Sequence, residues 1–456
     1  MPSASFYSMT EDEYSDLARA IIDKLNLTSV DQITKLKGSS FASSIRSFNT
    51  TMDSAFTQDG TLYFNSNIPD YACYQNKKVR KVVIGENVTY IGKAAFSGCT
   101  NLREVEFNAI NCSVFAVHNT GTVSEAIFSY DCPISSIIFG EHVESIPNDL
   151  FNVPGTNNFR TTTIENITIP ASCTRIGDYA FKCCKGIKSF TLHDGITYIG
   201  SYAFQYCTGL TSFYIPTGVT RIYARTFDNC SNLASITFHD GITRIDEGAC
   251  NYVAIRSFTT PPNLTYFGDR VFAYSQLEEL YLTAPGITGS SISYWLAYHY
   301  NLHKIVFGES FGSLPSYCFY NDNALQELIL LKASSIVTAS NSYTFNNCNI
   351  GAAGVAIYVP NALIETYRTT NYWASGNIPQ NLIAYQTSMT INSVSYNCNY
   401  GDSWSTFIAS ADNIDGFVIS GNNILNAAKT KYVSINSKAV KPTDLILGLS
   451  YDLVDI

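Results

Sequence analysis

The 456-residue sequence lacks the features that define several large classes of protein. It has no run of about 18 apolar residues, so no membrane-spanning helix and no membrane insertion are expected. Only 14% of the residues are charged and the net charge is −9, which argues against binding to nucleic acid. The motifs G-x-S-x-G, H-E-x-x-H, G-x-G-x-x-G and the P-loop are all absent. The sequence therefore predicts no enzyme, no cofactor and no metal site.

Leader and anchor signals are also missing, and methionine is scarce. The first residues, "MPSASFYSMT", have neither the basic nor the apolar region of a secretory signal, and the last residues carry no anchoring motif. The 13 cysteines are an odd number, which favours reduced core thiols over a disulfide framework. Methionine occurs 4 times, whereas tyrosine (31) and phenylalanine (27) are abundant, and this composition favours β-structure.

What the sequence does contain is a repeat. Ile176, Ile199, Ile222 and Ile245 follow one another at intervals of 23 residues. After Ile199, phenylalanine follows at +5, cysteine at +8, leucine at +11 and apolar residues at +14 and +16. Units this short cannot bury their own apolar side chains, so neighbouring units must stack and share one core. The repeat therefore predicts a solenoid of about thirteen coils.

Each repeat unit also predicts its own local structure. In "LTSFYI" (210–215), Phe213 and Ile215 alternate with polar residues, which is typical of a β-strand with one buried face. Equivalent segments in neighbouring units would form a parallel ladder of strands. A second short extended segment, Val219–Ile222, recurs in the same way. The "AF..C" segment between them is expected to form a helical or 3₁₀ turn.

The repeat resembles a known family. The unit "TRIGDYAFKCCKGIKSFTLHDG" (174–195) is similar to the BspA-like leucine-rich repeat, and the resemblance extends over residues 66–386. "VAIYVPNALIETYRTTNYW" (355–373) resembles the terminal unit of that family and places a C-terminal cap at about 355–386. The resemblance implies a leucine-rich-repeat solenoid, a β-rich α/β fold with a parallel β ladder and 23-residue coils. It also implies an adhesion or protein-binding surface that is usually extracellular and not catalytic.

The two flanking segments suggest where the protein acts. Within residues 1–65, an amphipathic helical segment begins with the capping box of Thr10 and Glu13 and resembles helical segments of bacteriophage tail proteins. Residues 387–456 predict a small β-module that resembles those at the ends of phage tail and other virion structural proteins. The residues that carry this second resemblance are Gly401, Trp404, Phe407, Ile408, Gly416, Phe417, Asp444, Ile446, Gly448 and Tyr451.

Cysteine recurs at one position of the repeat, at Cys99, Cys184, Cys207, Cys230 and Cys348. A metal site would need about four ligands that converge tetrahedrally. A 23-residue spacing instead stacks the thiols in a line, where cysteine packs as a small apolar residue. We therefore expect core packing.

Two His-Asp pairs, His193–Asp194 and His239–Asp240, have the composition of an acid/base site. They occupy the same loop position two coils apart, so common repeat ancestry explains them equally well. A general base also needs a substrate cleft nearby. We therefore expect ordinary surface-loop residues.

Binding residues are expected on the outer face of the strands and in two irregular insertions. Small hydroxyls beside an aromatic ring offer hydrogen bonds and a stacking surface, although any solvated sheet face must be polar. The insertions are residues 108–132 and 283–301, whose aromatic residues either bind a partner or fill the core. The candidate binding residues are Lys188, Thr191, Thr211, Tyr214, Ser235, Thr237, Tyr294, Trp295 and Tyr298.

Together these features predict a non-enzymatic binding or adhesion protein. The flanking resemblances favour a bacteriophage or prophage virion component, a decoration of the tail or capsid that binds the host surface. The alternative is a BspA-type surface adhesin of a cell. The expected partners are a protein or glycan of a host cell surface and other virion proteins, in a homo-oligomeric or multicopy assembly. A third possibility, a carbohydrate-active enzyme, needs a paired carboxylate cleft that no spacing predicts.

Overall fold

The structure is a computed structural model of the chain. It describes residues 57, 59–114, 125–129, 132–153, 164–287, 294–332, 334–376 and 378–385, together with the backbone of the strands within residues 388–455. The chain divides into two compact units, residues 1–255 with 266–275, and residues 256–265 with 276–456. Both units contain stacked coils with parallel strands, about 13 coils in all, so the predicted leucine-rich-repeat solenoid is confirmed.

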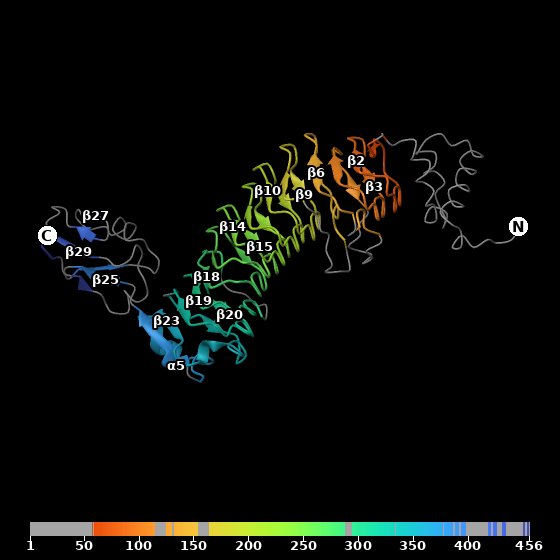
Figure 1. Cartoon of the computed structure of the whole chain (residues 1–456). Coiled ribbons are helices and arrows are strands. Elements are labelled where there is room, and N and C mark those ends of the chain that lie inside the picture. The colour runs from red at the N-terminus through yellow and green to blue at the C-terminus, as the bar shows by residue number, and fades with distance from the viewer. Residues whose placement is uncertain are drawn as a thin grey trace, which may run out of the picture. The chain divides into compact units, whose positions relative to one another are not determined.

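Every regular coil of the first unit has a long strand and a short strand on different sides (Figure 1). The long strands are β1 (Thr61–Phe64), β2 (Lys81–Ile84), β4 (Glu104–Phe107), β6 (Ser136–Phe139), β8 (Asn166–Thr168), β10 (Ser189–Thr191), β12 (Ser212–Tyr214) and β14 (Ser235–Thr237). The short strands are β3 (Tyr90–Ile91), β5 (Ser113–Val114), β7 (Ser145–Ile146), β9 (Arg175–Ile176), β11 (Tyr198–Ile199), β13 (Arg221–Ile222), β15 (Arg244–Ile245) and β17 (Tyr266–Phe267). The strands pair in parallel, and repeat-equivalent residues lie opposite one another, as Tyr214 does with Thr237.

The interior of the first unit is a column of phenylalanine rings that we call the phenylalanine spine. Its rings stack coil upon coil with centroids 5.4–5.8 Å apart, and each side chain is at most 1% exposed. The spine consists of Phe96, Phe128, Phe151, Phe181, Phe204 and Phe227. In the regular coils these phenylalanines occupy the +5 position of the repeat. Because the coils stack, residues at this position lie above one another and form a continuous core.

The third side of each coil is a run of turns, which corrects the predicted helical or 3₁₀ segment. Tyr202 and Tyr206 have φ angles of 58° and 62°, in the left-handed region that a helix does not use. Their N–H groups donate to the next coil, to the carbonyls of Ala224 (3.1 Å) and Asp228 (2.9 Å). Because these bonds run between coils, the backbone is satisfied without a helix.

The second unit continues the same pattern around its own sheets. Its long strands are β16 (Ser257–Thr259), β18 (Glu279–Leu282), β19 (Lys304–Phe307), β21 (Glu327–Leu330), β23 (Ala356–Pro360) and β24 (Leu382–Tyr385), which form one six-stranded sheet. The short strands are β20 (Ser313–Leu314) and β22 (Thr338–Ala339). The helical elements are η5 (Asn349–Gly351), η6 (Asn361–Leu363), α4 (Ile364–Thr369) and α5 (Ile378–Asn381). None of the helices in the described residues is long and apolar enough to cross a bilayer.

The region of the expected cap contains the strand β23, the Val359–Pro360 pair and then α4. Tyr367 and Trp373 are fully buried there, and both bind the backbone of Val337. The Tyr367 hydroxyl accepts the Val337 N–H (2.7 Å), and the Trp373 indole donates to the Val337 carbonyl (2.8 Å). These two bonds satisfy backbone groups that a last, uncovered coil would expose.

The described backbone of the final segment forms seven strands in two sheets. The three-stranded sheet contains β25 (Ser388–Ile391), β26 (Val394–Asn397) and β30 (Ser450–Tyr451), and the four-stranded sheet contains β27 (Val418–Ser420), β28 (Asn423–Leu425), β29 (Lys431–Ser434) and β31 (Val454–Asp455). The phage-like signature residues lie outside the described residues, except Tyr451 in β30. The helical segment expected within residues 1–65 also lies outside them, so both resemblances remain predictions.

Candidate binding surfaces

Six of the nine predicted binding residues lie on the long strands or, for Lys188 and Thr211, directly before them, and all six are exposed. In β12, Phe213 is 4% exposed and points inward, whereas Tyr214 is 43% exposed and points outward, as the alternation predicted. Thr237 lies beside Tyr214, and Thr191 lies in the outer row of β10. The long-strand face therefore presents Lys188, Thr191, Thr211, Tyr214, Ser235 and Thr237 to solvent; whether they bind a partner remains a prediction.

Two of these side chains are held in place by the loops and strands beside them. The Tyr214 hydroxyl donates to Asp194 Oδ1 (2.7 Å), and the Thr217 N–H donates to the same oxygen (2.9 Å). These hydrogen bonds to the ionised carboxylate lower the pKa of Asp194. Lys188 pairs with Glu165 of the neighbouring coil at 2.6 Å. The long-strand face is therefore ordered before any partner arrives.

The insertion at 283–301 is only partly a surface. Trp295 is 1% exposed and its ring stacks on Phe311 with centroids 5.8 Å apart, so it belongs to the core and its prediction as a binding residue is wrong. Burial of this large ring stabilises the coil more than exposure would. Tyr294 and Tyr298 are half-buried and lie on the turn side of the coil.

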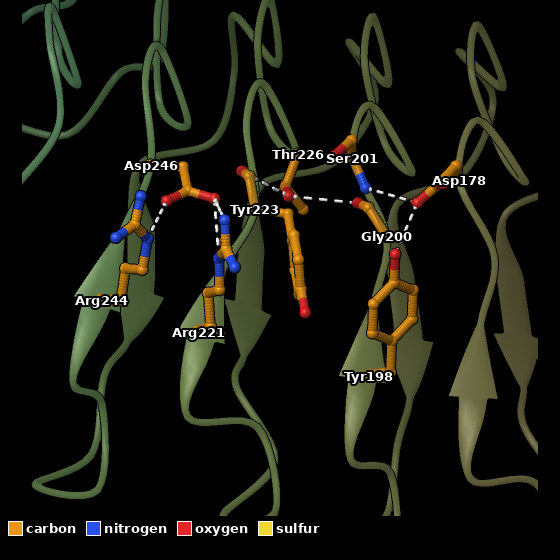
Figure 2. Close-up of polar contacts among 9 residues, drawn as sticks. All are labelled: Asp178, Tyr198, Gly200, Ser201, Arg221, Tyr223, Thr226, Arg244 and Asp246. Carbon is orange, nitrogen blue, oxygen red and sulfur yellow. Dashed lines mark hydrogen bonds and ion pairs between the residues drawn. The ribbon is translucent and has the colours of Figure 1, made fainter.

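The short strands carry a surface that the sequence analysis missed (Figure 2). Its outward row is arginine or tyrosine in successive coils, and the guanidinium groups lie over neighbouring tyrosine rings. Arg175 lies 3.7 Å from the Tyr198 ring centroid, and Arg244 lies 3.7 Å from that of Tyr266. Such cation–π contacts stabilise a charge at a half-exposed site. We call Arg175, Tyr198, Arg221, Tyr223, Arg244 and Tyr266 the arginine–tyrosine ladder.

Carboxylates beside the arginine–tyrosine ladder fix its geometry. Asp246, whose side chain is 9% exposed, accepts the Arg221 Nε–H (2.8 Å) on one oxygen and the Arg244 Nε–H (2.6 Å) on the other (Figure 2). Asp178 accepts the Tyr198 hydroxyl (2.8 Å). Burial, followed by this hydrogen bond, raises the pKa of Tyr198 to about 12. The phenol therefore stays neutral and donates at physiological pH.

A signal for the arginine–tyrosine ladder is present in the repeat. The residue that follows the isoleucine of each short strand is glycine in several coils, such as Gly177 after Ile176 and Gly200 after Ile199. A Cβ at either glycine would lie 2.5 Å or less from atoms of the preceding coil. Tyr223 and Asp246 occupy that position in the two coils between Gly200 and Gly268. Proline or serine takes this position in other coils, at Pro147, Pro315 and Ser340, so it is the tyrosine and the aspartate that mark the centre of this surface.

Removal of the bridging carboxylate should destabilise the first unit. We expect Asp246→Ala to lower the free energy of unfolding by about 1–2 kcal/mol, because two charge-assisted pairs lose their shared acceptor while both arginines stay partly solvated. Urea denaturation followed by circular dichroism measures this. The matched control is Glu278→Ala, whose pair with Arg256 is exposed and should contribute less than about 0.5 kcal/mol. Equal effects of the two variants would contradict the assigned role of Asp246.

The repeated cysteines pack inside the coils as expected, except that Cys348 is only partly buried. Cys184, Cys207 and Cys230 are at most 1% exposed, and the thiols of Cys207 and Cys230 donate to the carbonyls of Phe181 and Phe204 in the preceding coil. Burial raises the pKa of both of these thiols, so they are not thiolates at neutral pH. Within the described residues no group of three or more potential ligand side chains is placed to hold a metal.

The two loop histidines have a structural role. The imidazole of His193 bonds the Pro170 carbonyl through Nε2 (2.8 Å) and accepts the Gly195 N–H at Nδ1 (3.1 Å). His239 repeats this with the carbonyl of Pro216 and the N–H of Gly241. In each residue Nε2 joins the loop to the preceding coil and Nδ1 closes the turn of its own loop, so both ring nitrogens are already hydrogen-bonded.

Comparison with known proteins identifies the repeat. The family model described as "BspA type Leucine rich repeat region" matches residues 66–155, 153–278 and 283–409 in six copies. The comparison with curated proteins finds no match.

Three of the similar solved structures are described as leucine-rich or leucine-rich-repeat proteins, and each has low sequence identity to this chain. One from Bacteroides ovatus is 16% identical, with a TM-score of 0.48 over 73% of this chain and 93% of that chain. One from Eubacterium ventriosum is 18% identical, with a TM-score of 0.35 over 64% and 91%. A leucine-rich cell surface protein from Faecalibacterium prausnitzii is 16% identical, with a TM-score of 0.29 over 78% and 92%. Because the family model matches well over half of the chain, this protein belongs to the BspA-type leucine-rich-repeat family.

Proposed function

We propose that this chain is a non-catalytic binding protein that attaches to a protein or glycan of a host cell surface. The observation that carries the proposal is that the reactive side chains are hydrogen-bonded within the coils, whereas the exposed side chains of the long strands are hydroxyls and an aromatic ring. The repeated thiols and loop histidines are engaged within the coils, whereas rows of hydroxyls with Tyr214 face the solvent on the long strands. Repeated weak contacts along such rows add up to stable attachment when several copies act together.

Two settings fit this role. The resemblances of the two flanking segments favour a bacteriophage or prophage virion, in which the protein decorates the tail or capsid and also contacts other virion proteins. The repeat family by itself fits a cellular surface adhesin equally well. Immunogold electron microscopy of purified particles and of intact producer cells separates the two, because gold would label particles in the first case and cell envelopes in the second.

Binding through the long-strand face is tested with the labelled full chain and intact bacterial cells in flow cytometry. We expect the triple variant Thr191→Ala, Tyr214→Ala, Thr237→Ala to bind at least tenfold more weakly, a change of about 1.4 kcal/mol. The matched control replaces Thr197, Thr220 and Thr243 with alanine, three exposed hydroxyls at equal spacing beside the short strands. Equal loss in both triple variants would contradict a specific role of the long-strand face, and no binding by the unmodified chain would contradict the proposed function.

A further inference from the structure

A column of tyrosine rings lies on the turn side of the second unit. Tyr294, Tyr317 and Tyr343 come from three consecutive coils and stack with centroids 4.8 and 5.2 Å apart and interplanar angles of 5° and 17°. Tyr298 and Tyr320 lie beside the column and meet each other edge to face at 5.8 Å. Tyr343 ends the column, half of its surface is exposed, and among the described residues its ring contacts only that of Tyr317. We call these five residues the tyrosine platform.

The backbone does not require tyrosine at these positions. Tyr294, Tyr298 and Tyr317 have φ angles of 65°, 70° and 53°, a region in which glycine or asparagine is accommodated with less strain. Asn321 and Asn347 occupy the corresponding turn position in the next two coils, with φ angles of 66° and 51°. Tyr179 and Tyr202 of the first unit adopt the same left-handed conformation, so this geometry is common to the repeat, and the platform is distinguished instead by its column of three stacked rings.

The tyrosine platform carries no charge. The turn segments 294–301, 316–321 and 341–347 contain no Asp, Glu, Lys or Arg; His299 within them is 2% exposed, and Asp322, which directly follows the second segment, is 0% exposed. Their polar groups are amides and hydroxyls: the Asn347 amide donates to Asn321, and that of Asn341 donates to Ser316. The matching turns of the first unit differ, because Arg225 and Arg270 flank Glu247 there at 3.6 and 3.8 Å.

We infer that the tyrosine platform is a binding site for an uncharged polysaccharide. This inference rests on the proposed binding function and names the ligand class for one surface. Sugar rings have an apolar face that stacks on an aromatic ring such as Tyr343, and their hydroxyls bond amides and phenols. A surface without charges gives no attraction to an anionic chain, and it leaves no charged group to be desolvated by a neutral one.

The test is affinity electrophoresis of the full chain in native gels that contain dextran, mannan, xylan or mixed-linkage β-glucan. We expect at least one of these neutral polymers to retard the protein, with little dependence on salt. Tyr343→Ala should weaken this binding about tenfold, whereas Tyr343→Phe should retain most of it because the ring remains. The matched control is Tyr252→Ala, which removes a 42% exposed tyrosine stacked on Tyr274 at 4.7 Å in the first unit.

Three results would overturn the inference. They are retardation by none of the four polymers, retardation that Tyr343→Ala and Tyr252→Ala reduce equally, and binding only to an anionic polymer such as heparin. If any of these occurs while the full chain still binds intact cells, the proposed function stands and the assignment of the tyrosine platform fails. If the chain binds neither polymers nor cells, both fail.

Discussion

Phe204→Ala is expected to lower the free energy of unfolding by about 3–5 kcal/mol, the largest effect of any single substitution considered for this protein. Phe204 is 0% exposed and stands in the middle of the phenylalanine spine, stacked on Phe181 at 5.8 Å and on Phe227 at 5.7 Å. It also packs against Phe190 and Phe213 of the long strands. Alanine would leave a cavity that stacked coils cannot collapse to fill, because their spacing is set by the strands.

Urea denaturation, followed by far-ultraviolet circular dichroism of the backbone, measures the change in the free energy of unfolding. The matched control is Tyr214→Ala in the same coil, which removes a ring of similar size that is 43% exposed and should cost less than about 1 kcal/mol. A loss below about 1 kcal/mol for Phe204→Ala would contradict a shared interior, because each coil would then be stable without its neighbours' rings.

Asp322→Asn is expected to raise the free energy of unfolding by about 1–3 kcal/mol at pH 7, because the neutral amide does not carry the desolvation cost of a buried carboxylate. Asp322 occupies the cysteine position of its coil, is 0% exposed, and its Oδ2 has no hydrogen-bond partner in the structure. Its Oδ1 accepts the backbone N–H of His299 at 2.7 Å, and an asparagine side chain can accept the same hydrogen bond. Asn76 occupies the same position of another coil at 4% exposure, so the site accepts an amide.

The pH dependence of this effect has a definite sign. Burial raises the pKa of Asp322 above its ordinary value of 3.8, so the folded state holds the proton more tightly than the unfolded state. Stability therefore falls as the pH rises from the unfolded pKa through the raised folded pKa, and the penalty is complete above it. We expect the advantage of Asp322→Asn to be present at pH 7 and to disappear below about pH 4.

Thermal or urea unfolding of both proteins across this pH range tests the sign. The control with the opposite sign is Asp194→Asn, because hydrogen bonds lower the pKa of Asp194 and its charged form is the favoured one. A destabilising effect of Asp322→Asn at pH 7 would contradict an unfavourable carboxylate and would indicate a favourable pair with His299, whose Nδ1 lies 3.7 Å from Oδ1.

Outward-facing residues show where sequence reasoning about the binding surface succeeds and where it fails. The alternation in "LTSFYI" places Tyr214 outside and Phe213 inside, as the structure does. This prediction succeeds because successive side chains of a β-strand point to opposite faces of the sheet. Trp295 was misplaced because no period runs through the insertion at 283–301, so nothing in its neighbours indicates which way it faces. The turns do not continue into a helix because alternate N–H groups donate to the next coil, while those between them close single turns to the carbonyl three residues back.

The sequence by itself determined the interior of this protein. The phenylalanine at +5 and the cysteine at +8 of the regular units become the phenylalanine spine and the thiol column, because stacking at a constant repeat length puts equal positions above one another. Only the tertiary structure decided the exterior chemistry. Asp246 bridges Arg221 and Arg244, and the tyrosine platform forms across three coils, because side chains on separate coils meet only after stacking has set their distance and orientation.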